Sequence, residues 1–193
     1  MEQDLKVEYF QEHRDFVNSE IKNFLTRLKF PNASVLEIGP SPSLKIKELI
    51  PECKYVCADI VKRENIDFQI DLTTPNSINI EDQFDIIVCA EVLEHVVEPF
   101  QAVQSIFNLL KPSGAIIATT PLNLRIHGPI PDCWRFTEFG LRVLFRNFDL
   151  IEINNLKTPD RPLFPLHYSL LALKPKVFRE LQPQEMIFVK VNP

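Results

Sequence analysis

Short apolar runs, each followed by a turn or a helical pattern, recur along the first 155 residues of the chain. Residues 35–38 form one such run, which is interrupted only by Glu37 and stops at Gly39. Residues 84–90 are almost entirely apolar, and residues 115–119 repeat the pattern. Continuous apolar runs of this length are typical of parallel strands buried on both faces. Their alternation with helices predicts right-handed crossovers and an open α/β sheet.

The remaining pattern predicts further strands, further helices and one long cover. Strands are expected at residues 54–58, 66–70, 148–153 and 186–191, the last as the antiparallel partner in a terminal hairpin. Helices are expected at residues 8–29, 44–50, 99–110 and 137–145. The proline-rich residues 157–184 are interleaved with aromatic and leucine side chains, so they are expected to form an ordered, irregular cover.

Length and composition favour a single domain. The 193 residues carry a net charge of −5 and are 45% hydrophobic. We expect one domain over residues 1–193, with an N-terminal helix in 1–30, a core in 31–155 and a cover with a terminal strand in 156–193. The acidic balance argues against nucleic-acid binding, and no apolar run approaches the ~20 residues of a membrane span. The charged N-terminus predicts a cytoplasmic location. Composition does not indicate an oligomeric state.

The cysteines and histidines show no metal-ligand spacing in the sequence. The four cysteines include no C-x-x-C pair and are expected to be reduced. The histidines, His13, His95, His127 and His167, lie far apart along the chain, and none is close to a cysteine at a metal-binding interval. The sequence therefore predicts no metal.

The turn after the first strand has an unusual set of backbone donors. Ser41 is a good N-cap and Pro42 suits the first position of a helix. Because Pro40 and Pro42 lack N–H groups, only those of Gly39, Ser41 and Ser43 could face a ligand. Such a turn suits a carboxylate or amino group better than a pyrophosphate, and the dinucleotide pattern G-x-G-x-x-G is absent.

Two acidic residues follow predicted strands on the expected ligand side. Asp59 lies 22 positions after Glu37, close to the ~20-residue interval at which α/β nucleotide folds place an acid on a ribose. The alternative is a solvated loop aspartate. Asp71 could accept a hydrogen bond from a purine amine, with the Leu72 backbone facing a ring nitrogen, or it could cap the turn at residues 73–75.

Four motifs occur in a characteristic order. They are V-L-E-I-G at 35–39, F-D-I-I-V-C-A-E-V-L-E-H-V at 84–96, L-K-P-S-G-A-I-I-A-T-T-P at 110–121 and H-G-P-I-P-D-C-W-R-F-T-E-F-G-L-R at 127–142. Together with the acid after the second strand, the first three resemble the class I S-adenosylmethionine-dependent methyltransferases over about residues 30–155. The fourth resembles a branch found with surface-polysaccharide and natural-product biosynthesis.

This resemblance implies a Rossmann-like three-layer sandwich with a mostly parallel seven-stranded sheet and an antiparallel last strand. It implies S-adenosylmethionine as the cofactor, with Asp59 on the ribose and Asp71 and Leu72 on the adenine. The full set of cofactor-binding residues implied is Glu37, Gly39, Pro40, Ser41, Asp59, Ile60, Asp71, Leu72, Ala90 and Glu91. The family usually shows G-x-G-x-G where this chain has Gly39, Ser41 and Ser43.

An irregular segment after the fifth predicted strand carries the candidate chemistry. His127 is a candidate general base because the segment lies on the ligand side of the sheet, and the alternative is a structural loop histidine. Asp132 and Arg135 either contact the acceptor or pair to fix the loop. Trp134 either covers the site or lies in the core. His95, next to Glu94, is expected to be structural.

The resemblance also implies the class of reaction. We expect methyl transfer to a small-molecule or sugar acceptor, with a hydroxyl as the methylated group, in surface-polysaccharide or secondary-metabolite biosynthesis. One alternative is an inactive methyltransferase-like binding or scaffold protein. Another is an NAD-dependent enzyme on a related sheet, against which the missing G-x-G-x-x-G argues.

Overall fold

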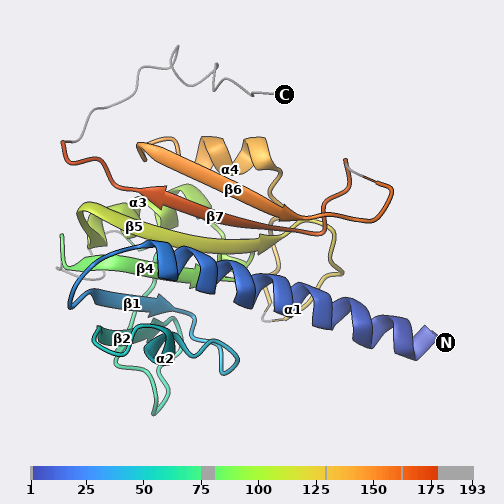
Figure 1. Cartoon of the computed structure of the whole chain (residues 1–193), viewed down its shortest axis with the longest axis horizontal. Helices are drawn as coiled ribbons and strands as arrows, with labels where there is room; N and C mark the ends of the chain where they lie inside the picture. The colour runs from blue at the N-terminus through green and yellow to red at the C-terminus, as the bar shows by residue number, and fades with distance from the viewer. Residues whose placement is uncertain (1, 75–80, 129, 162, 178–193) are drawn as a thin grey trace.

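A seven-stranded sheet runs through the computed structural model, which describes residues 2–74, 81–128, 130–161 and 163–177 (Figure 1). The strands are β1 Ser34–Ile38, β2 Lys54–Asp59, β3 Phe68–Gln69, β4 Phe84–Ala90, β5 Leu110–Pro121, β6 Leu150–Leu156 and β7 His167–Leu173. Their order is β3-β2-β1-β4-β5-β7-β6. Strand β7 runs antiparallel to both its neighbours, and the other described pairs are parallel. The predicted fold class is thus confirmed.

Helices cover both faces of this sheet. The described helices are α1 Glu2–Arg27, α2 Ile46–Leu49, the short 3-10 helix η1 Leu93–His95, α3 Pro99–Leu109 and α4 Glu138–Leu144. Alternate strand residues separate two cores: Ile86 and Val88 pack with α1 and α2, and Ile87 and Cys89 pack with α3 and α4. The sandwich therefore has three layers, as period-two alternation on a doubly covered sheet requires.

Helix α1 follows from the apolar stripe in the sequence. Val17, Ile21 and Phe24 are buried on the sheet, with polar residues between them. At its C-terminal end, Arg27 forms a bidentate pair with Glu152 of β6, at 2.6 and 2.8 Å. Figure 1 shows α1 lying along the sheet, with its N-terminal half extending past the carboxyl end of β5. The predicted packing of this helix on the body is confirmed.

The antiparallel strand lies at a different place from the one predicted. Strand β7 occupies His167–Leu173, inside the segment expected to be an irregular cover, and six of its seven residues are buried. That expectation was wrong because prolines before and after the strand dominate the local composition. Between Pro165 and Pro175 there is no proline to remove a ladder hydrogen bond. The strand expected at residues 186–191 lies outside the described residues.

The turn after β1 also differs from the prediction. Helix α2 begins at Ile46 with Lys45 at its N-cap and no side-chain cap, so the assignment of Ser41 as N-cap was wrong. Ser41 instead accepts a turn hydrogen bond from Leu44 N, and its hydroxyl pairs with that of Ser43 at 2.9 Å. The local pairing of the two serines competes with capping. Residues 111–114, with Pro112 and Gly114, lie within β5.

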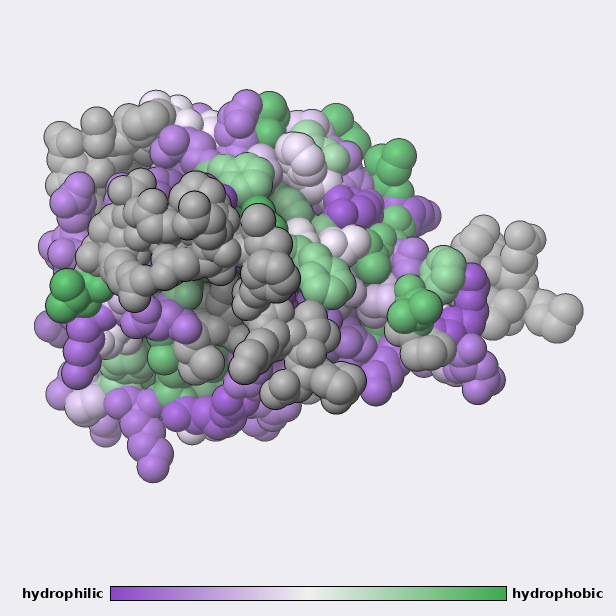
Figure 2. All heavy atoms as spheres, turned by 90° about the horizontal axis from the view of Figure 1, so that it is seen from above, coloured by the Kyte–Doolittle hydropathy of each residue, from purple (hydrophilic) through white to green (hydrophobic). Residues whose placement is uncertain are grey.

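Apolar and polar groups alternate over much of the surface. Figure 2 shows apolar side chains interspersed with polar ones on the face seen from above. Large apolar side chains that remain exposed include Ile60, Val61, Phe100, Ile126, Phe139 and Leu163. No described helix is long and apolar enough to cross a membrane.

Replacing Gly39 with alanine should destabilise the fold. Its φ is +65°, and an added Cβ would lie 2.6 Å from Cγ2 of Val92. Positive-φ strain and overpacking together should lower the free energy of unfolding by about 2–4 kcal/mol, measured by urea denaturation. Gly128→Ala is a matched control, because a Cβ there meets nothing within 4 Å. Equal stability of the two variants would contradict this expectation.

Candidate active site

The carboxyl ends of three neighbouring strands meet at one edge of the sheet. In the register, Ile38 of β1 lies between Ala58 of β2 and Cys89 of β4. The chain continues from β1 to β2 on one side and returns to β4 on the other, so this is a topological switch point. Open α/β sheets bind ligands outside the carboxyl ends of their strands at such points. Gly39 and Asp59 thus lie at the same edge, as predicted.

The buried Glu37 side chain holds the turn that follows β1. Its Oε2 accepts a 2.5 Å hydrogen bond from the hydroxyl of Tyr55, and its Oε1 accepts one from Ser41 N at 3.2 Å. Burial raises the pKa of Glu37 above its ordinary value, and burial with this hydrogen bond raises the pKa of Tyr55. Tyr55 carried no signal in the sequence beyond its place in an apolar run.

The backbone donors of this turn are used within the protein. Gly39 N donates to Ala58 O at 2.9 Å, and Ser41 N donates to Glu37. Ser43 N lies 3.4 Å from Ser41 Oγ. The expectation that these three N–H groups face a ligand was therefore wrong, because the sheet ladder and nearby side chains accept from them first. Pro40 and Pro42 lie between these residues and have no N–H group to donate.

Asp59 ends β2 with a carboxylate that already has two partners. Its Oδ1 accepts from Val61 N at 2.9 Å, and its Oδ2 is ion-paired with Arg63. The Arg63 side chain is 56% exposed, whereas that of Asp59 is 12% exposed. Ile60 beside it is 61% exposed.

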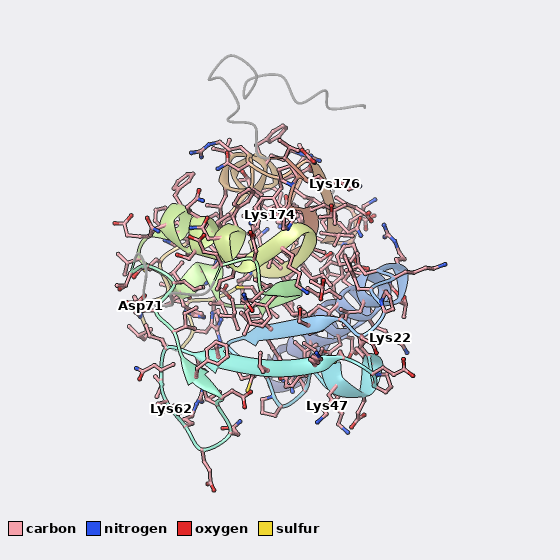
Figure 3. All side chains as sticks on the ribbon, turned by 90° about the vertical axis from the view of Figure 1, so that its left-hand side faces the viewer. Lys22, Lys47, Lys62, Asp71, Lys174 and Lys176 are labelled. Atoms are coloured by element: carbon pink, nitrogen blue, oxygen red, sulfur yellow. The ribbon has the colours of Figure 1, made fainter. Side chains whose placement is uncertain are left out.

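Asp71 and Leu72 are engaged in the connection after β3. Asp71 accepts from the backbone N–H and hydroxyl of Thr73 and from the hydroxyl of Thr74, at 2.7 to 2.9 Å. The hydrogen bonds from Thr73 hold the pKa of Asp71 below its ordinary value. Leu72 is buried, and its carbonyl accepts from Ser105. Figure 3 shows Asp71 at the margin of the sheet. Of the two interpretations of Asp71, the structure favours turn capping.

Glu91, directly after Ala90 of β4, begins a hydrogen-bonded chain across the sheet. Its φ is +56°, and its Oε1 accepts from Thr119 Oγ1 at 2.8 Å and from His167 Nε2 at 2.7 Å. Nδ1 of His167 lies 2.9 Å from Nδ1 of His13 in α1. Burial opposes ionisation, yet the hydrogen bond and charge of His167 bring the pKa of Glu91 below its ordinary value. Sequence spacing carried no signal for these histidine partners.

The free energy of unfolding should decrease as the pH is lowered, because His13 titrates differently in the folded and unfolded chains. Burial, reinforced by His167, lowers the pKa of His13 to about 4. The unfolded chain protonates this side chain below pH ~6.5, so its contribution is fully present above that pH and is lost as pH falls to about 4. The loss should reach about 3 kcal/mol. Urea denaturation of wild type and His13→Gln at several pH values checks this, and parallel pH profiles would contradict it.

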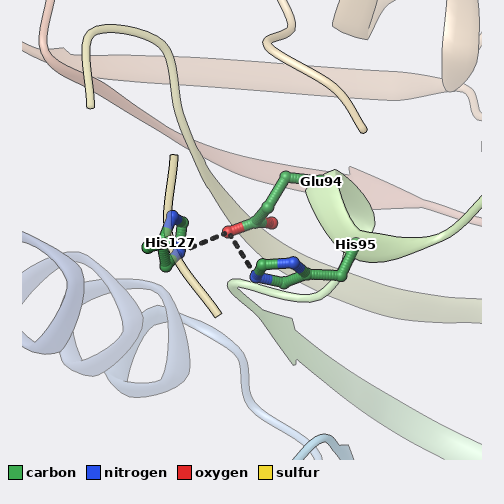
Figure 4. A group of neighbouring side chains, drawn as sticks. All are labelled: Glu94, His95 and His127. Carbon is green, nitrogen blue, oxygen red and sulfur yellow. Dashed lines mark ion pairs between the residues drawn. The ribbon is translucent and has the colours of Figure 1, made fainter. Parts of the chain in front are cut away.

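A buried carboxylate and two imidazoles lie close together in the segments after β4 and β5. Glu94 and His95 come from η1, and His127 comes from the segment after β5 (Figure 4). Oε1 of the fully buried Glu94 lies 3.8 Å from Nε2 of His95 and 4.0 Å from Nε2 of His127. Neither carboxylate oxygen of Glu94 has a hydrogen-bond partner among the described residues. Burial, together with the charge of Glu91, raises the pKa of Glu94 well above its ordinary value.

An enclosed ion pair fixes the segment that carries His127. Arg135 and Asp132 form a bidentate pair at 2.5 and 2.7 Å, and Arg135 also donates to the carbonyls of Leu124 and Arg125. Asp132 Oδ2 accepts from the backbone N–H of His127 and lies 3.2 Å from its Nδ1. The Asp132 carboxylate is fully enclosed. Of the two interpretations of this pair, the structure favours loop fixing.

Trp134 is a partly exposed cover. Its side chain is 40% exposed, stacks on Phe136 and donates from Nε1 to Val96 O at 2.8 Å. The interpretation of Trp134 as a core residue was therefore wrong. The neighbouring Cys133 N donates to Glu94 O at 2.7 Å, so this cover is tied to η1.

The fold changes the basis for the metal prediction. Sequence spacing alone gave no ligand set, because 32 positions separate His95 from His127. In the structure one ligand atom from each of Glu94, His95 and His127 lies within 4.8 Å of the others. His95 is thus part of this cluster.

Comparison with known proteins identifies the family. A family model described as a methyltransferase domain matches residues 10–155. Ubiquinone biosynthesis O-methyltransferase of Glaesserella parasuis serovar 5 (strain SH0165) is 44% identical over 50 residues, which cover 26% of this chain and 21% of that protein. The matched part of the chain therefore spans about a fifth of that relative's length.

Solved structures share the fold at low identity. A SAM dependent methyltransferase from Archaeoglobus fulgidus superposes with a TM-score of 0.64, 14% identity and coverage of 83% of this chain and 94% of that one. N-methyltransferase NodS from Bradyrhizobium japonicum WM9 superposes with a TM-score of 0.58 and 18% identity, and the match covers 82% of this chain and 97% of that one. The CurJ carbon methyltransferase superposes with a TM-score of 0.63 and 14% identity, and the match covers 84% of this chain and 54% of that one. The chain therefore spans about half of that protein. The chain therefore belongs to the methyltransferase domain family.

Proposed function

We propose that this chain transfers the methyl group of S-adenosylmethionine to a hydroxyl of a small-molecule or glycan acceptor, in surface-polysaccharide or secondary-metabolite biosynthesis. The observation that carries the proposal is the placement of His127. Its imidazole lies beside the carboxyl end of β4, and an enclosed carboxylate lies 3.2 Å from its Nδ1. No hydrogen bond joins the two atoms in this structure, but a carboxylate charge at this distance would favour a proton on Nδ1 and leave Nε2 as the base.

A base distinguishes hydroxyl acceptors from stronger nucleophiles. Methyl transfer from a sulfonium needs donor and acceptor in line, and positioning supplies much of the rate. A neutral hydroxyl gains about 10²–10⁴-fold more when a base removes its proton. In the proposed step the proton passes to Nε2 of His127 and the acceptor oxygen bonds to the methyl carbon. The carbon–sulfur bond breaks with its electron pair on sulfur, which leaves S-adenosylhomocysteine.

Residues at the carboxyl edge would hold the cofactor, which supplies an activated methyl group. Asp59 would accept from the ribose hydroxyls once Arg63 rotates away, and the exposed Ile60 would pack on the base. The Gly39–Ser41 turn would border the methionine part on one side, and Ala90 with Glu91 on the other. Asp71 contributes less, because both its carboxylate oxygens already accept from threonines.

The comparisons support transfer to oxygen without deciding the acceptor. The similar proteins named above include one oxygen, one nitrogen and one carbon methyltransferase. The oxygen enzyme is 44% identical to this chain over a segment of 50 residues. Trp134 and its neighbours after β5 would line the acceptor side, with Asp132 and Arg135 holding the segment in place.

Acceptor screening with product mass as the readout tests this proposal. The purified chain is incubated with S-adenosylmethionine and panels of sugar, sugar-phosphate and phenolic hydroxyl acceptors, beside matched amines. We expect one added methyl group on a hydroxyl acceptor, and none when the same hydroxyl is already methylated. Methylation of amines alone would overturn the assignment to oxygen.

A further inference from the structure

The cluster of Glu94, His95 and His127 is arranged as a set of ligands around one point. One ligand atom from each residue lies within 4.8 Å of the others, and both Nε2 atoms face Glu94 Oε1 (Figure 4). Two ligands bound to one ion at about 2.0–2.2 Å lie roughly 3–3.5 Å apart. Small side-chain rotations, of the order of 1 Å at the ligand atoms, would close the set.

Both imidazoles have an oxygen acceptor behind the ring. Nδ1 of His95 lies 3.0 Å from the carbonyl oxygen of Pro131, which can only accept, so this nitrogen carries the proton. Nδ1 of His127 lies 3.2 Å from Oδ2 of Asp132. The hydrogen bond leaves Nε2 of His95 with a free lone pair 3.8 Å from Oε1 of Glu94, whereas Nδ1 of His127 makes no hydrogen bond and its Nε2 lies 4.0 Å from the same oxygen. Metal-binding histidines are typically held this way, with a carboxylate or carbonyl on the other nitrogen.

Glu94 supplies an independent indication of a missing partner. The residue is fully buried, and neither carboxylate oxygen accepts a hydrogen bond among the described residues. A buried polar group without a partner is costly, and buried charges are normally paired or bound to a metal. We propose that Glu94, His95 and His127 bind one divalent transition-metal ion.

The ligand types favour a particular class of ion. Imidazole nitrogens suit zinc, iron, nickel and copper, whereas magnesium and calcium prefer oxygen ligands throughout. Three protein ligands leave at least one coordination position for water or an acceptor oxygen. If the proposed function holds, a hydroxyl bound there would lose its proton to solvent near neutral pH. With the ion bound, His127 would act on the acceptor as a metal ligand and no longer as the base. The ion would then stabilise the negative charge on the acceptor oxygen.

Zinc binding by the full chain tests the site directly. Metal-stripped wild type titrated calorimetrically with Zn²⁺ alone should show one saturable site, and Glu94→Gln and His127→Asn should each weaken it at least about 100-fold. Glu48→Gln changes an exposed glutamate in α2, and Cys133→Ser removes an exposed thiol near the cluster. Both control variants should bind zinc as wild type does.

Each other outcome overturns the site. Absence of zinc binding by folded wild type does so, as does binding that survives both cluster variants or disappears in Cys133→Ser. Circular dichroism establishes that each variant is folded, and His127→Asn serves if Glu94→Gln does not fold. Parallel titrations with S-adenosylmethionine in EDTA separate the two proposals. Cofactor binding without zinc binding rejects only the metal site, and zinc binding without any methyl transfer rejects only the proposed function.

Discussion

Asp59→Ala should weaken the binding of S-adenosylmethionine by about 100-fold or more while the chain stays folded. A hydrogen bond to a charged group contributes about 1.5–3 kcal/mol, and a carboxylate that accepts from both ribose hydroxyls makes two. A loss of ~3 kcal/mol corresponds to a factor of about 150. The position at the carboxyl end of β2, beside the switch point, is the reason for assigning this role to Asp59. Isothermal titration calorimetry measures the change.

Arg63→Ala is the matched control for that variant. Arg63 occupies one oxygen of Asp59 in the unliganded chain, so it competes with the ribose. Exposed ion pairs contribute about 0–1 kcal/mol, and removing this one should leave cofactor affinity unchanged or raise it by up to about fivefold. Normal affinity in Asp59→Ala would refute the ribose assignment. A large loss in Arg63→Ala would show instead that the arginine itself contacts the cofactor.

His127→Ala should lower turnover by about 10²–10⁴-fold and leave the affinity for S-adenosylmethionine close to that of wild type. The imidazole is proposed to act on the acceptor, either as a base or as a ligand, and is not among the residues proposed to hold the cofactor. Single-turnover kinetics on an accepted hydroxyl measures the loss, and calorimetry measures cofactor affinity.

Two further variants define what the loss means. Asp132→Asn removes the negative charge 3.2 Å from Nδ1 of His127, so turnover should fall, but by a smaller factor than in His127→Ala. Ile126→Ala changes an exposed neighbouring side chain and should leave turnover near wild type. Unchanged turnover in His127→Ala would remove this residue from the reaction.

The central strands could be predicted because burial on both faces leaves a simple signature. Strand β4 coincides with the predicted residues 84–90, and α3 begins at the predicted Pro99. Strand β7 was missed because prolines flank its sequence. A strand at that position is defined by long-range pairing with β5 and β6, which local composition does not reveal.

The candidate site divides in the same way. Asp59 and Glu91 could be placed at one edge of the sheet from sequence order alone, because each lies at or just after the end of a predicted strand, and Glu37 lies one residue before the end of β1. Their partners mostly could not be predicted, since Tyr55 and His167 come from other strands. Arg63 is the exception: an arginine four positions after an acid is a local signal that could have been used. The meeting of His95 with His127 depends on the path of the segment after β5.

Calorimetric titration of the wild-type full chain with S-adenosylmethionine tests the proposed cofactor site most directly. We expect one saturable site per chain, with a dissociation constant between about 1 μM and 1 mM, and competition by S-adenosylhomocysteine. A folded chain that takes up no S-adenosylmethionine over this range would contradict the assignment of a methyl-transfer site. It would favour a methyltransferase-like scaffold in which Arg63 permanently occupies Asp59.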